Sequence, residues 1–252
     1  MSLLPSTQSI VARLEALSQR PVHITEDASL NLVADIKVAR GNQPVHLLRY
    51  RPTGSTPADY IIAYQCGLAL RVFETPPEQR ADLGVCEAGR KQLADLLRDP
   101  KFPAMIRSMG DSLLLSLLTQ LRSFPVGLRV DTWLHASYPD LRDLQKQAVR
   151  AQLNENLQSL TAGMAGFFPA KLSRSSLGMN AAFALHWSQL WNEPALTLPY
   201  KAAGLLERGE NLMKIFHQIP ADPANDRQLI DEWAFDLGIK GWYQFVPHAP
   251  AA

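Results

Sequence analysis

The feature that most constrains this chain is a stretch of apolar residues at helical spacing between residues 57 and 73. Its apolar positions recur at intervals of three and four, which is the pattern of an amphipathic helix with one face in the core. We expect Thr56 to be the N-cap, Pro57 to lie in the first turn and Asp59 to favour the positive end of the helix. The rest of the chain is therefore expected to be organised around this helix.

The segments before this helix are predicted to form one further helix and a small group of strands. Residues 8–19 are predicted to form an amphipathic helix, and residues 22–25 a short strand. Apolar and mostly polar side chains alternate through residues 30–38, which predicts a strand with one buried face, and residues 45–51 are predicted to be the returning strand. The expected order is helix, two or three strands in a meander, and then the 57–73 helix.

Within the 57–73 helix, the segment Tyr64-Gln65-Cys66-Gly67-Leu68 resembles the His-Glu-x-x-His helix of zincin metallopeptidases, including the small ImmA/IrrE-like enzymes. Gly67 is the least generic match, because glycine inside a helix costs about 1 kcal/mol relative to alanine. In active zincins the two histidines bind zinc and the glutamate activates water. Here Tyr64, Gln65 and Leu68 occupy those positions. The resemblance therefore implies the fold without catalytic residues, a metal site or a cofactor.

The resemblance also implies a cleft beside this helix. Zincins place a helix and a short sheet before the metal-binding helix, and the substrate pairs as an added strand with an edge strand over the cleft. Residues 45–51 would be that edge strand in this chain. The candidate binding residues are therefore those on the helix and on this strand: Tyr64, Gln65, Leu68, His46 and Leu48.

One alternative chemistry uses residues of the same region. A Cys66 thiol with His46 as its base would be a nucleophilic pair. A cysteine inside an apolar helix, however, usually behaves as a small hydrophobic residue. Glu87 stands nineteen residues after Leu68, a spacing at which some zincins supply a third zinc ligand, but one carboxylate without two histidines does not hold zinc. Neither observation points to catalysis.

After residue 73 the pattern becomes mostly helical. Helices are expected at residues 89–97, 102–124, 140–160, 178–191, 200–216 and 227–237, and residues 239–246 are expected to close as a short strand. We expect a break in the second of these helices at Gly110, and a loop or short strand at residues 124–131. The sequence thus predicts an α+β, predominantly helical fold. A zincin-like region at residues 1–100 would be followed by a helical region at 101–252 packed on it as one compact body.

The charge and the apolar content of the chain exclude further classes of function. The chain has 25 Lys and Arg against 24 Asp and Glu, a formal charge of +1, which does not indicate a dominant surface for nucleic acids. It shows no secretory signal and no apolar run long enough to span a bilayer, so we expect a cytoplasmic protein without a membrane partner. The predicted function is a catalytically inactive zincin-like module that binds a protein partner. A hydrolase with unrecognised residues and a regulator associated with nucleic acid remain the alternatives.

Overall fold

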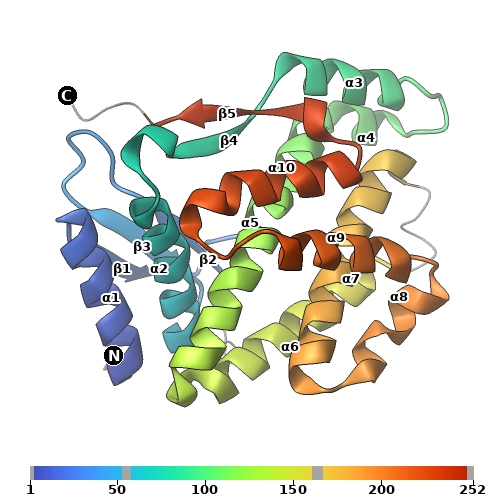
Figure 1. The fold of residues 1–252 in the computed structure, drawn as a ribbon. Coiled ribbons are helices and arrows are strands. Elements are labelled where there is room, and N and C mark those ends of the chain that lie inside the picture. Colours follow the sequence, from blue (N-terminus) through green and yellow to red (C-terminus); the bar gives the residue numbers. More distant parts are fainter. Residues whose placement is uncertain (1–2, 53–57, 161–166, 249–252) are drawn as a thin grey trace. The chain divides into compact units, whose positions relative to one another are not determined.

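The structure is a computed structural model that describes residues 3–52, 58–160 and 167–248 (Figure 1). The described residues contain ten α-helices and two small β-sheets, which confirms the predicted α+β, mainly helical class. They divide into two compact units. The first contains the described residues of 1–81, 129–152 and 247–252, and the second those of 82–128 and 153–246. This division differs from the predicted boundary at residue 100, because segments from the second half of the chain belong to the first unit.

The first unit begins with one helix, three strands and a second helix. These elements are α1 (Pro5–Ser18), β1 (Val22–Glu26), β2 (Ala34–Lys37), β3 (His46–Tyr50) and α2 (Ala58–Glu74). The helices expected at 8–19 and 57–73 and the strand expected at 22–25 are therefore confirmed. The strand expected at 30–38 is shorter than predicted, and Leu32 is exposed. Thr56 and Pro57, the expected start of α2, lie outside the described residues.

The strand order of this first sheet is β1-β3-β2. Strand β1 runs parallel to β3, and β2 runs antiparallel to it. The predicted meander is therefore wrong, and so is the prediction that residues 45–51 form an edge strand. The side chains of His46, Leu48 and Tyr50 are all buried along β3, which is the burial expected of a central strand with one face in the core.

Helix α2 lies at the centre of the first core. It packs against α1, and its buried residues share a cluster with Ile10, Leu48 and Val130. A Cβ atom built on Gly67 would lie 2.6 Å from Cγ1 of Val130, so glycine is what allows this close approach between α2 and α5 (Gly110–Ser137). The glycine that the sequence singled out thus has a packing role in this fold.

The remaining elements are mostly helical. They are β4 (Ala81–Val85), α3 (Glu87–Leu97), α4 (Ala104–Ser108), α5 (Gly110–Ser137), α6 (Arg142–Gln158), α7 (Ala170–Trp191), α8 (Leu198–Ala202), α9 (Leu206–Gln218), α10 (Asp226–Asp236) and β5 (Tyr243–Pro247). The break expected at Gly110 is confirmed, since α4 ends just before it. Strands β4 and β5 pair as a second sheet, so the expected terminal strand is confirmed although its partner β4 was not predicted (Figure 1).

Two predictions in this part of the chain are wrong. The loop or strand expected at residues 124–131 is an interior part of α5, with Pro125 inside the helix. The single helix expected at 200–216 is divided into α8 and α9 at Gly204, whose φ of +69° is one that glycine adopts readily. None of the described helices is long and apolar enough to cross a membrane.

Candidate functional site

The two predicted site residues on β3 are core residues. Leu48 is fully buried in the cluster beneath α2. The backbone N–H of Ala39 donates to Nδ1 of His46 at 2.9 Å, so Nε2 carries the proton and faces the hydroxyl of Ser18, also at 2.9 Å. Burial lowers the pKa of His46, and the nearby Arg20 acts in the same direction. His46 is therefore a neutral, hydrogen-bonded core residue in this structure.

The three predicted site residues on α2 are half-buried. Leu68 and Tyr64 pack against the core cluster, and the ring of Tyr64 lies 6.0 Å from that of Tyr60. Gln65 lies beside them on the same helix. The structure thus brings Tyr64, Leu68 and Leu48 to one hydrophobic cluster, whereas His46 and Gln65 are not among the described members of that cluster.

The alternative nucleophile on α2 is also enclosed. Cys66 has no exposed surface, and burial raises the pKa of its thiol to about 12, so the thiolate is scarce at neutral pH. Glu87 is the exposed first residue of α3. No group of three His, Cys, Asp or Glu side chains among residues 3–52, 58–160 and 167–248 lies where it could hold a metal ion.

A buried polar network, which the sequence did not reveal, adjoins the motif helix. The Tyr60 hydroxyl of α2 donates to Oδ1 of Asp131 on α5 at 2.5 Å. The Gln145 amide of α6 donates to the same Oδ1 at 3.1 Å and to the backbone carbonyl of Asp131 at 3.0 Å. All three side chains are buried, with Asp131 only 2% exposed. Each donor has an acceptor, as buried polar groups require.

Burial dominates the electrostatics of this network. It raises the pKa of Asp131 to about 7, although the hydrogen bonds from Tyr60 and Gln145 act in the opposite direction. Burial also raises the pKa of Tyr60 and Tyr64, and the charge of Asp131 adds to that effect. A carboxyl group that titrates near neutrality is a common feature of active sites. At 2% exposure, however, this one is closed to a substrate, and its hydrogen bonds give it a structural role.

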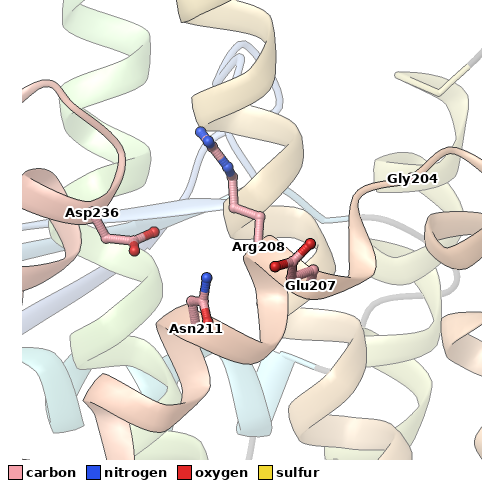
Figure 2. Close-up of a pocket in the computed structure, with 5 residues that line it drawn as sticks. All are labelled: Gly204, Glu207, Arg208, Asn211 and Asp236. Atoms are coloured by element: carbon pink, nitrogen blue, oxygen red, sulfur yellow. The ribbon is translucent and has the colours of Figure 1, made fainter.

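A second polar site lies within the second unit. It is a pocket of about 270 Å³ lined by Gly204, Glu207, Arg208, Asn211 and Asp236 (Figure 2). Glu207, Arg208 and Asn211 share one side of α9, because residues three and four apart lie on the same helix face. Gly204 is in the turn before α9, and Asp236 is the last residue of α10. No pattern in the sequence indicated this site, since its residues come from two helices and a turn.

The charged groups of this pocket are held apart. Figure 2 shows the Asp236 carboxylate and the Asn211 carboxamide pointing toward the same open space beside the Arg208 side chain. A Cβ atom on Gly178 would lie 2.7 Å from Cδ of Arg208, so the stem of this arginine rests directly on the backbone of α7. Partial burial raises the pKa of Asp236, and the positive charge of Arg208 opposes that rise. The pocket thus presents a half-buried guanidinium and a half-buried carboxylate, together with the exposed carboxylate of Glu207.

Comparison with known proteins does not assign either site. No protein-family model matches the chain, and neither the curated proteins nor the solved structures contain a match. The function must therefore be inferred from the chemistry of the chain itself.

Proposed function

We propose that this chain is a catalytically inactive, zincin-like protein that binds an extended segment of a protein partner along strand β2. The observation that carries the proposal is the direction of the backbone groups of β2. The Arg51 N–H donates to the Val33 carbonyl at 2.9 Å, immediately before the pairing of Asp35 with Arg49. Hydrogen-bonded pairs alternate along an antiparallel ladder. Ala34 and Ile36 therefore direct their N–H and C=O groups away from β3.

The outer edge of β2 is open to such a partner. Among the described residues, neither Ala34 nor Ile36 forms a hydrogen bond on the side that faces away from β3. Strand β1 differs at the opposite edge of the sheet, because the Glu15 carboxylate already accepts the hydrogen bond of the Val22 N–H at 2.8 Å. Unpaired edge groups in a row form the template for an added strand, so β2 is the better acceptor.

The sheet around β2 is fixed by ion pairs on its face. Arg49 on β3 bonds to Asp35 at 2.6 Å and to Asp27 at 3.2 Å. These contacts join β2 and the end of β1 to the central strand, so the edge is held in an extended conformation before a partner arrives. A preorganised edge lowers the ordering cost of binding. In the zincin comparison, the antiparallel edge strand would then be β2 instead of residues 45–51.

The test removes one outward donor without removing a bond of the sheet. Ala34 is the first residue of an edge strand, a position that tolerates proline, and its N–H faces away from β3. Peptides selected from a display library against the wild-type protein would be titrated into wild type, Ala34→Pro and Ala34→Thr. Loss of one hydrogen bond is expected to weaken binding by roughly tenfold in Ala34→Pro, while Ala34→Thr, which keeps the N–H, binds as wild type does.

Amide NMR shifts give the second measurement. Peptide binding should move the backbone resonances of Ala34 and Ile36 more than those of β1. Selected peptides that bind Ala34→Pro with unchanged affinity, or that shift resonances only outside β2, would exclude this edge as the binding surface. Circular dichroism and urea midpoints of both variants establish that they are folded.

A further inference from the structure

The pocket of the second unit contains two charged groups that form no hydrogen bond or ion pair within the described part of the chain. Arg208 and Asp236 are close enough to influence each other electrostatically, yet neither forms a hydrogen bond or an ion pair with another of the described residues. Both side chains are half-buried. A half-buried charge without a partner gives up part of its hydration and gains no hydrogen bond in return. A ligand with complementary charges would restore those interactions.

The charge pattern of the pocket specifies the ligand. Its lining has two carboxylates, Glu207 and Asp236, one guanidinium, Arg208, and one carboxamide, Asn211. The complement is a molecule with one anionic and two cationic groups. We propose that this pocket binds a free basic α-amino acid, with the ligand carboxylate on Arg208, its α-ammonium on Asp236 and its side-chain cation toward Glu207. This site is independent of strand β2 and of the proposed partner.

The fixed side chain of Arg208 suits the contact with the ligand's carboxylate. Arginine offers paired donors in a plane, which is the arrangement that recognises a carboxylate in bidentate form. Its stem is fixed against Gly178, where a side chain would collide with it. Asn211 lines the same pocket, and its carboxamide both donates and accepts, so it can bond to a carboxylate or an ammonium of the ligand. A volume of about 270 Å³ accommodates one small ligand.

The test uses L-lysine as the probe on the whole, ¹⁵N-labelled chain. Titration is expected to shift the amide resonances of Gly204 and Asn211 in a saturable manner. Three analogues each lack one charged group: cadaverine has no carboxylate, N-acetyl-L-lysine has no α-ammonium and L-norleucine has no side-chain cation. Because each lost group forfeits a charge-assisted contact, every analogue is expected to bind at least about tenfold more weakly than L-lysine.

Variants of the lining assign the contacts to residues. Arg208→Gln and Asp236→Asn remove one charge each, and each is expected to weaken L-lysine binding by about tenfold or more. Arg208→Gln should reduce the difference between L-lysine and cadaverine, and Asp236→Asn that between L-lysine and N-acetyl-L-lysine. Glu210→Gln is the matched control, because Glu210 is exposed on the same helix and does not line the pocket.

Three results would overturn the proposal. The first is the absence of saturable shifts at Gly204 and Asn211 with millimolar L-lysine. The second is equal affinity for L-lysine and cadaverine. The third is unchanged affinity in both Arg208→Gln and Asp236→Asn when their circular dichroism matches that of the wild type.

Discussion

The two polar sites of this molecule differ in how their hydrogen bonds are satisfied. In the first unit, Tyr60 and Gln145 donate to Asp131, and all three side chains are buried. In the second unit, Arg208 and Asp236 line an open pocket, and neither forms a hydrogen bond or an ion pair with another described residue. A buried charge or polar group that is satisfied internally supports the fold, whereas one that is left unsatisfied beside a cavity is available to a ligand. Whether the polar groups are hydrogen-bonded within the protein thus distinguishes the structural site from the proposed binding site.

The largest expected effect comes from removing the acceptor of the closed network. Asp131→Ala leaves the Tyr60 hydroxyl without its buried acceptor, and the Gln145 amide keeps only the backbone carbonyl of residue 131. The unsatisfied hydroxyl costs about 1–3 kcal/mol and the lost Gln145 hydrogen bond about 1 kcal/mol, so the free energy of unfolding should fall by roughly 2–4 kcal/mol. Urea denaturation of the variant and the wild type measures this difference. A loss below about 0.5 kcal/mol, the range of ordinary surface substitutions, would show that the network does not support the fold.

The next effect is a dependence of stability on pH. The Asp131 carboxyl has a pKa of about 7 in the folded chain and about 3.9 when unfolded. Between about pH 4 and pH 7 the folded chain holds this proton and the unfolded chain does not. The Asp131 contribution is therefore complete at acid pH and falls, by about 4 kcal/mol in total, as the pH rises through that window.

The pH effect is measured as the difference between wild type and Asp131→Asn in urea midpoints at several pH values. Asparagine remains uncharged, so the part of the slope that Asp131 causes should disappear in the variant. Identical pH profiles for the two proteins would mean that the carboxyl keeps the same pKa in both states. That result would show that burial does not raise the pKa of Asp131 in the folded chain.

The sequence allowed the local elements to be predicted better than their pairing. Helix α2 has an apolar pattern that is complete within seventeen residues, and it forms as expected. Strand β3 is central because β1 pairs with it in parallel, although β2 lies between the two in the sequence. No local sequence pattern specifies such a pairing. The predicted binding edge was therefore assigned to the wrong strand.

Both polar sites escaped prediction for related reasons. Asp131 was expected in a loop or short strand at residues 124–131, yet α5 continues through Pro125 and Gly127. Proline inside a helix costs about 3 kcal/mol, and burial of Leu121 and Leu128 on either side offsets that cost. The pocket depends on Arg208 and Asp236 meeting from different helices. The distance between these two residues in the sequence follows no helical or strand period, so no pattern could indicate that they line one pocket.

The smallest expected effect tests the open site. Asp236→Asn removes a carboxylate that has no hydrogen bond or ion pair among the described residues. Partial burial disfavours its charge, and the attraction of Arg208 favours it, so the two contributions oppose each other. The free energy of unfolding should therefore change by less than about 0.5 kcal/mol in the absence of ligand, in contrast to the loss in Asp131→Ala. Urea denaturation at neutral pH measures both variants under the same conditions. A cost in Asp236→Asn comparable to that in Asp131→Ala would mean that Asp236 supports the fold as Asp131 does, and the distinction between a closed structural site and an open binding site would no longer hold.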